Sequence, residues 1–194
     1  MKKLLFLSAA TFILVAAVHA QTSVALVKNE IKSYKKQESA MKKEKREERK
    51  ELKKLEGNVV SDQSKDAFYG DFGKIPVSKW ERTAYYDKAT FIKDGEVMTA
   101  YYDADSKLVG TTSQKAFTDI PAAAQKFIDA KYKDYSKEDV VFFDDNEWNE
   151  TDMIMYGNQF ADADNYFVEL VKDNKDIILQ VNMLGNVIFF KLLK

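Results

Sequence analysis

Imidazole and thiol groups carry out most nucleophilic catalysis and much of the metal binding in proteins, and this chain of 194 residues has one histidine and no cysteine. The histidine, His19, lies in a segment with the pattern of an export signal. Once that segment is removed, the chain cannot form a Ser-His-Asp or Cys-His group. It also lacks the ligands of an ordinary zinc, haem or iron–sulfur site. These classes of chemistry are therefore not expected.

Carboxylates are the remaining groups that could act chemically. Two of them held about 5–9.5 Å apart can hydrolyse a glycosidic bond, but no pair stands out in this acid-rich sequence. Asp103-Ala104-Asp105 and Asp162-Ala163-Asp164 offer oxygen ligands for calcium, yet neither has the glycine and downstream glutamate of a calcium loop. Both are interpreted as turns. We predict no catalytic residue, no cofactor and no metal site, with a carboxylate-based hydrolase as the least favoured alternative to a non-enzymatic protein.

Residues 1–20 have the three parts of a secretory signal peptide. Met1-Lys2-Lys3 is basic, Leu4 to Val18 is apolar, and Val18-His19-Ala20 is a cleavage site. The apolar run is shorter than the roughly 20 residues that span a bilayer. We therefore expect cleavage and a periplasmic or secreted mature protein. Because it has no cysteine, its core alone must hold it together, without disulfide bonds or a lipid anchor.

Charge divides the mature chain into a basic arm and an acidic body. Residues 21–57 hold 12 basic and 7 acidic side chains, whereas the remainder holds 16 and 24. The arm has no proline, and its only glycine is Gly57, so it is predicted to be a charged amphipathic helix. Its apolar seam is Val24, Val27, Ile31, Tyr34, Met41, Leu52 and Leu55.

Glu38, Lys45 and Glu48 interrupt this seam, which a stable coiled coil would need unbroken. We therefore expect a solvated helix that helps to hold the acidic body or an anionic surface, and no strong homodimer. Nucleic-acid binding is not expected, because acidic residues interleave with the basic ones.

Beyond residue 57, short β-branched and aromatic runs between turn signals predict strands. The chain matches itself at a shift of 79 residues, which aligns Lys93-Asp94-Gly95 with Lys172-Asp173-Asn174 and Leu108-Val109 with Val187-Ile188. Each copy has the pattern strand, turn, strand, turn, strand. A helix is expected before each copy, one at about 62–72 and one with Asp119 as its N-cap. We predict repeats at 58–117 and 118–194, the second with an insertion at about 144–164.

Two copies of a helix followed by antiparallel strands predict an α+β fold with the helices on one face of the sheet. Whether the strands form one sheet or two stays open. Alternation along the strands turns one set of residues toward the helices. This set is Ala89, Phe91, Met98, Ala100, Tyr102, Val168, Leu170, Ile177, Leu179 and Val181. The opposite set points to an open face and is Thr90, Ile92, Thr99, Tyr101, Glu169, Val171, Ile178 and Gln180.

The order of these elements resembles a known family. The segments that carry the resemblance are Ala67-Phe68, Asp71-Phe72-Gly73, Val77-Ser78-Lys79-Trp80, Ala89-Thr90-Phe91, Thr99-Ala100-Tyr101-Tyr102-Asp103, Ile120-Pro121 and Gly185-Asn186-Val187-Ile188. Together they look like exported PepSY-like proteins of Bacteroidetes, which are grouped with the beta-lactamase-inhibitor-like fold. The resemblance covers about 61–194. It implies a tandem helix-plus-sheet repeat and the binding or inhibition of an exported enzyme, with no common catalytic site.

These observations predict an exported, non-enzymatic binding protein that contacts another exported protein or peptide through the open sheet face. The insertion adds Trp, Met and Tyr side chains, which are favoured at interfaces. The candidate contact residues are Thr99, Tyr101, Glu169, Ile178, Gln180, Trp148, Met155 and Tyr156. For the insertion, the alternative is a hairpin that covers a sheet edge or packs on the arm. For the protein, it is a structural envelope component held by its N-terminal helix.

Overall fold

A computed structural model describes residues 57–194 without a gap and, before them, residues 24, 26–37, 39–41, 43–44, 47–48, 51 and 54–55. The chain divides into two units, Met1–Glu48 and Arg49–Lys194. The predicted signal peptide, residues 1–20, lies outside the described residues, as does Leu52 of the predicted seam. The described residues before Gly57 are helical. The other six seam residues are exposed there.

Residues 57–194, here called the body, form an α+β structure. Two helices, one 3₁₀ turn and ten strands follow one another along the chain. They are α2 (Asp62–Phe72), β1 (Val77–Arg82), β2 (Asp87–Lys93), β3 (Glu96–Tyr102), β4 (Leu108–Lys115), η1 (Phe117–Asp119), α3 (Ala122–Lys131), β5 (Ser136–Asp145), β6 (Ile154–Met155), β7 (Asn158–Gln159), β8 (Asn165–Lys172), β9 (Lys175–Asn182) and β10 (Val187–Leu192).

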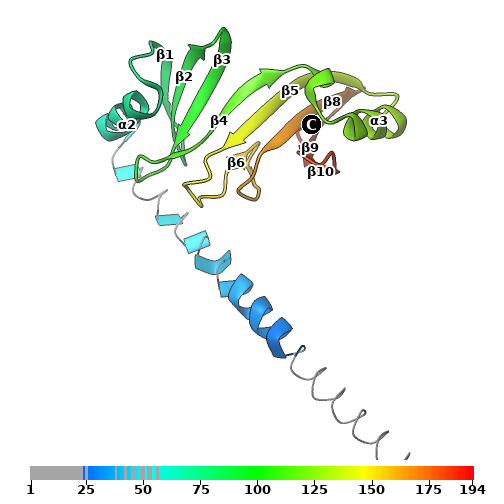
Figure 1. Cartoon of the computed structure of the whole chain (residues 1–194), viewed down its shortest axis with the longest axis horizontal. Coiled ribbons are helices and arrows are strands. Elements are labelled where there is room, and N and C mark those ends of the chain that lie inside the picture. The colour runs from blue at the N-terminus through cyan, green and yellow to red at the C-terminus, as the bar shows by residue number, and fades with distance from the viewer. Residues whose placement is uncertain are drawn as a thin grey trace, which may run out of the picture. The chain divides into compact units, whose positions relative to one another are not determined.

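Eight of the strands form one antiparallel sheet in the order β1-β2-β3-β4-β5-β8-β9-β10 (Figure 1). The sequence left the number of sheets open, and the pairing of β4 with β5 joins the two halves into one. The short strands β6 and β7 pair only with each other, between β5 and β8 in the chain. They belong to the predicted insertion.

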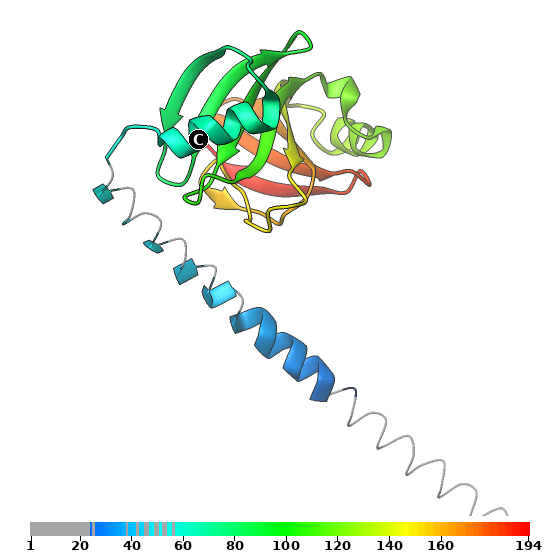
Figure 2. The same ribbon diagram turned by 60° about the vertical axis from the view of Figure 1, so that its left-hand side comes forward.

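Helix α2 packs on the first half of the sheet (Figure 2). Its N-cap is Ser61, whose Oγ accepts a hydrogen bond from Ser64 N at 2.9 Å. Phe68 is fully buried at the centre of this contact, and its ring meets Phe91 and Trp80 edge to face at 4.9 and 5.5 Å between centroids. Such aromatic pairs add to the free energy of burial.

Helix α3 packs on the second half of the sheet through Ala124 and Ile128, both fully buried. The prediction of its N-cap was wrong. Pro121 is the N-cap, and the Asp119 carboxylate instead accepts a hydrogen bond from Ala116 N at 2.8 Å, at the 3₁₀ turn η1. The Asp119 side chain therefore caps the 3₁₀ turn η1 and does not cap helix α3.

The residues predicted to face the helices are confirmed in both halves. In the first half they pack against α2, and in the second against α3. The β2–β3 turn has positive φ angles at Asp94 and Gly95, as the predicted two-residue turn requires. The turn reading of Asp103 is also confirmed, because its Oδ1 accepts hydrogen bonds from Asp105 N at 2.9 Å and Lys107 N at 3.1 Å.

Candidate protein-binding surface

The insertion packs on the sheet face opposite the helices. Met153 and Phe160, at the two ends of the hairpin, are buried there. The Phe160 ring meets Phe143, Phe167 and Phe190, with centroid distances of 5.2, 4.9 and 6.0 Å. The hairpin is therefore part of a second hydrophobic core. The part of the sheet face that lies beneath the hairpin is not open.

Polar contacts fix the hairpin in this place. Tyr86 Oη donates a hydrogen bond to Asp152 O at 3.4 Å and accepts one from Ile154 N at 3.1 Å. In β7, Asn158 Nδ2 donates a hydrogen bond to Phe190 O at 2.9 Å. Phe190 lies within the register shift of β10, so Asn158 satisfies a carbonyl group at the irregular part of that edge strand.

The loop that leads from β5 into the hairpin carries Trp148, which is 95% exposed. Two asparagine side chains attach this loop to β4. Asn146 Nδ2 and Asn149 Nδ2 both donate hydrogen bonds to Leu108 O, at 2.7 and 3.0 Å. The backbone adds Asn146 N to Val109 O at 3.0 Å. The indole is thus presented to solvent from a loop whose flanking residues are fixed to the sheet.

Of the eight candidate contact residues, only Trp148 falls in the exposed class. Ile178 is fully buried under the insertion, so predicting it as a contact residue was wrong. Tyr101 is half-buried, and its Oη shares a hydrogen bond with Thr112 Oγ1 at 3.2 Å. The other five, all half-buried, are Thr99, Glu169, Gln180, Met155 and Tyr156.

Two of these half-buried residues have altered proton affinities on the partly covered face. Burial, followed by the charge of Glu169, raises the pKa of Tyr156 to about 12. Burial, followed by the charge of Asp139, raises the pKa of Glu169 above its ordinary value. Both groups therefore keep their protons to a higher pH than they would in water.

The sequence reasoning missed two exposed residues in the β9–β10 turn. Leu184 is 83% exposed and Met183 is 50% exposed. With the residues around Asp145 and Asp164 they line a pocket of about 410 Å³. A hydrophobic pair in a turn otherwise built from Asn and Gly was the available signal, because turn positions normally carry polar residues.

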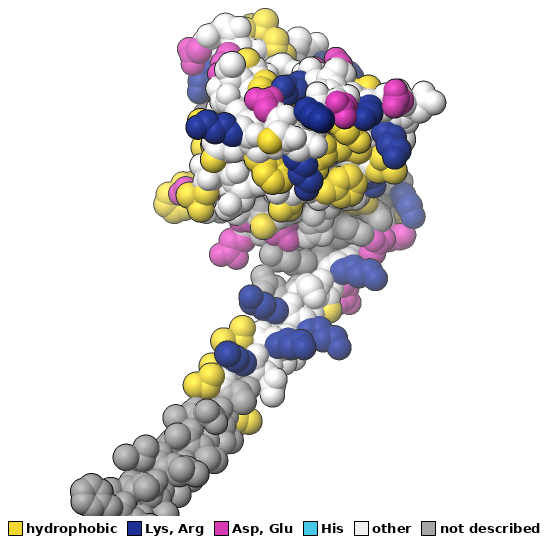
Figure 3. All heavy atoms as spheres, turned by 90° about the vertical axis from the view of Figure 1, so that its right-hand side faces the viewer, with side chains coloured by type: hydrophobic (Ala, Val, Ile, Leu, Met, Phe, Trp, Pro, Cys, Tyr) yellow, Lys and Arg dark blue, Asp and Glu magenta, His cyan; other side chains and the backbone are white. Residues whose placement is uncertain are grey.

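A further set of exposed apolar residues lies on α3 and β10. Figure 3 looks onto this end of the body and shows apolar side chains gathered beside lysines. The exposed members are Phe127, Ile188, Phe189 and Leu192. Lys131 Nζ lies 5.1 Å from the centroid of the Phe127 ring, so a lysine covers part of this group.

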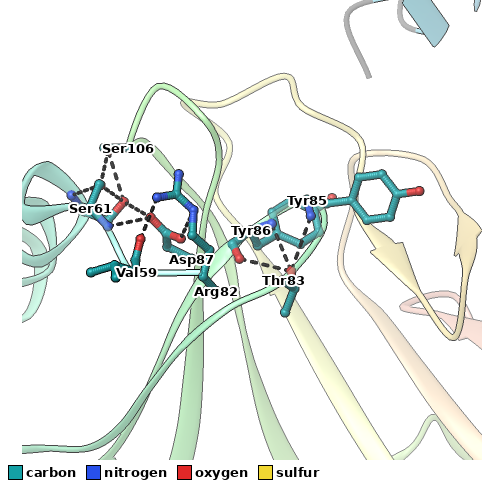
Figure 4. Close-up of polar contacts among 9 residues, drawn as sticks. Val59, Ser61, Arg82, Thr83, Tyr85, Tyr86, Asp87 and Ser106 are labelled. Atoms are coloured by element: carbon teal, nitrogen blue, oxygen red, sulfur yellow. Dashed lines mark hydrogen bonds and ion pairs between the residues drawn. The ribbon is translucent and has the colours of Figure 1, made fainter. Parts of the chain in front are cut away.

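A buried polar network lies where the body begins (Figure 4). The Asp87 carboxylate accepts hydrogen bonds from Ser61 N and Ser64 Oγ, at 3.2 and 2.9 Å, and lies 3.4 Å from Arg82 Nε. Arg82 also donates to Val59 O at 2.6 Å. These contacts hold the first residues of the body against β1 and β2. The network therefore has a structural role.

Within the described ranges, no group of three or more acidic, histidine or cysteine side chains is placed to hold a metal ion. No described helix combines the length and apolar character needed to cross a membrane.

No family model matches the sequence, and no curated protein matches it. Solved structures do. A BLIP-like protein from Bacteroides fragilis NCTC 9343 is 20% identical with a TM-score of 0.53, over 70% of this chain and 87% of that one. A DUF2874 family protein from Bacteroides uniformis ATCC 8492 is 14% identical with a TM-score of 0.55, over 67% and 87%.

A protein of Bacteroides eggerthii DSM 20697, provisionally assigned to the periplasm, is 15% identical with a TM-score of 0.54, over 69% and 88% of the two chains. Each of the three matches covers most of the known structure, and in this chain each match is about as long as the body. The predicted resemblance is thereby confirmed at the level of the fold, and the chain has the fold of the BLIP-like and DUF2874 proteins of Bacteroides.

Proposed function

We propose that this is an exported, non-enzymatic binding protein whose contact surface is centred on the Trp148 loop. The observation that carries the proposal is an indole that is 95% exposed on a loop fixed to β4 through Asn146 and Asn149. A large aromatic side chain in a preformed loop loses little conformational entropy when it enters a partner's pocket. The half-buried residues Thr99 and Tyr101 of β3 are proposed as further contact residues.

We also propose an inhibitor-like role toward an exported enzyme or peptide. The support is the fold shared with a protein called BLIP-like and with one provisionally assigned to the periplasm. Fold alone is a weak guide to function, so the role depends on the surface itself. The expected signal peptide supports export.

The body is further proposed to be a tandem repeat. The β3–β4 turn has bonds from Asp105 N and Lys107 N to Asp103 Oδ1. The β9–β10 turn, 79 residues later, has bonds from Leu184 N and Asn186 N to Asn182 Oδ1. Positive φ angles occur at the corresponding positions Ser106 and Gly185. These matching bonds support two copies of one unit, and superposition of residues 93–109 on 172–188 tests it.

Capture from an envelope extract tests the binding function. The immobilised mature protein is expected to retain a partner, and Trp148→Ala should weaken the purified complex by about 2 kcal/mol, roughly thirtyfold. Tyr69→Ala is the matched control, because Tyr69 is an exposed aromatic residue on α2, on the opposite face of the sheet. It should leave the affinity unchanged.

The competing function is a structural envelope component held by the helical arm. In that case the partner would be retained equally by Trp148→Ala and lost when residues 21–56 are removed. That result would overturn the proposed contact surface.

A further inference from the structure

We propose that the partner places a lysine or arginine side chain in the acidic pocket beside Trp148, so that the surface selects a basic segment of another exported protein. This inference rests on the proposed function and adds the chemistry of the partner.

The pocket has a volume of about 410 Å³ and is formed by three separate stretches of chain. These are the end of β5 and the loop after it, the loop between β7 and β8, and the β9–β10 turn. Its lining has four carboxylates, three apolar side chains and one asparagine, and no lysine or arginine. The eight residues are Asp145, Glu147, Asp162, Ala163, Asp164, Asn182, Met183 and Leu184.

The carboxylates are held close together in the fold. Asp145 N donates a hydrogen bond to Asp164 Oδ1 at 2.9 Å, which joins the two stems of the insertion. Asp145 Oδ1 is itself buried. Burial, followed by the neighbouring Asp162 carboxyl, raises the pKa of Asp145 to about 7. Clustered carboxylates favour an incoming positive charge, because its attraction offsets their mutual repulsion.

The apolar part of the pocket selects the kind of cation. Met183 and Leu184 are 50% and 83% exposed, and they offer a surface for the methylene groups of a lysine or arginine. Trp148 follows Glu147 directly in the chain, so the exposed indole and one acid of the lining lie in the same loop. A hydrated metal ion would use neither feature. Charge and apolar surface together therefore fit an amphipathic basic peptide.

A fluorescence titration tests this chemistry. In mature protein carrying Trp80→Phe, which keeps a ring against Phe68, Trp148 is the only tryptophan and reports binding. A tryptophan-free lysine–leucine peptide should shift its emission to shorter wavelength, with an affinity that falls as salt rises. A glutamate–leucine peptide of equal length should produce no shift.

Charge variants locate the site. Asp145→Asn combined with Glu147→Gln should weaken binding of the lysine peptide at least fivefold. Glu138→Gln is the matched control, because Glu138 is an exposed acid near the other end of β5, and it should change the affinity less than twofold.

Four results would overturn the inference. They are unchanged binding in the double variant, equal binding of the glutamate peptide, displacement of the lysine peptide by millimolar calcium alone, and self-association of the protein that the double variant abolishes. The last would make a second copy the occupant. If Trp148→Ala releases the captured partner and the double variant does not, the proposed function stands and this inference fails.

Discussion

Asp87 connects three residues near the start of the body. Its side chain and that of Arg82 are 3% and 7% exposed, and Asp87 also accepts bonds from Ser61 and Ser64. Breaking a buried pair costs about 3–5 kcal/mol, because the remaining charge stays desolvated. We expect Asp87→Asn, which keeps the shape of the side chain, to lower the free energy of unfolding by about 3 kcal/mol in urea denaturation.

Glu81 provides the comparison for Asp87. Its carboxylate lies 3.2 Å from Lys79 Nζ and 3.1 Å from Lys88 Nζ, but it is exposed to solvent. Exposed pairs contribute about 0–1 kcal/mol, so Glu81→Gln should have a small effect. Equal losses in the two variants would contradict the importance of burial at Asp87.

Asp145 should make stability depend on pH. Its pKa is raised from 3.8 to about 7 by burial and by Asp162. Between those values the folded state binds more protons than the unfolded state, so the free energy of unfolding falls as pH rises from about 4 to 7. Because the side chain is partly exposed, we expect a loss of about 1 kcal/mol. Asp145→Asn should remove this loss, which urea denaturation at pH 5 and at pH 8 would detect. A variant-to-wild-type difference that is the same at both pH values would contradict it.

Single residues show how far sequence reasoning reaches. Trp148 is predicted as a contact residue because it is a large aromatic residue among acids in an insertion, and it is exposed in the structure. The burial of Ile178 could not be predicted, because it depends on where some twenty residues fold back onto the sheet. Alternation assigned Ile178 to the correct face, and tertiary packing then covered that face.

At the scale of elements, Gly110 in β4 leaves no room for a side chain beside β5. A Cβ atom there would lie 2.6 Å from Asp144 O and 2.6 Å from the nearest ring atoms of Phe143. Gly110→Ala should therefore lower the free energy of unfolding by about 2–3 kcal/mol. Gly70 in α2 has nothing within 4 Å of an added Cβ, so Gly70→Ala should stabilise by about 0.5–1 kcal/mol. Thermal unfolding would separate the two, and a tolerated Gly110→Ala would show that β4 and β5 can move apart.

The elements were predicted better than the site. Helix α2 has the bounds expected from sequence, and the strands follow from alternation and from the Asp-Gly and Asp-Asn turns. The pocket beside Trp148 could not be predicted in this way. It combines Glu147, Asp162 and Leu184 from three loops, and no local pattern relates loops that meet only through folding.

At the scale of the whole molecule, the basic arm is predicted to make salt-sensitive contacts and no strong homodimer. The mature protein should therefore sediment as a monomer at low and at high salt. Contacts between exposed charges weaken as the Debye length falls below about 8 Å, so cleavage between Met41 and Leu55 should increase with salt. A salt-resistant dimer that disappears when residues 21–56 are deleted would contradict this.

The strand order of the large sheet bears on how the chain folds. Each strand of the large sheet after β1 pairs with the sheet strand that precedes it in the chain, and only the step from β5 to β8 crosses the insertion. Pairing between neighbours in sequence lowers the contact order and favours rapid folding. Closing a loop of about twenty residues costs roughly 2 kcal/mol more than closing a two-residue turn. The β6–β7 hairpin shortens that loop if it forms first, so the insertion is expected to help β8 join the growing sheet.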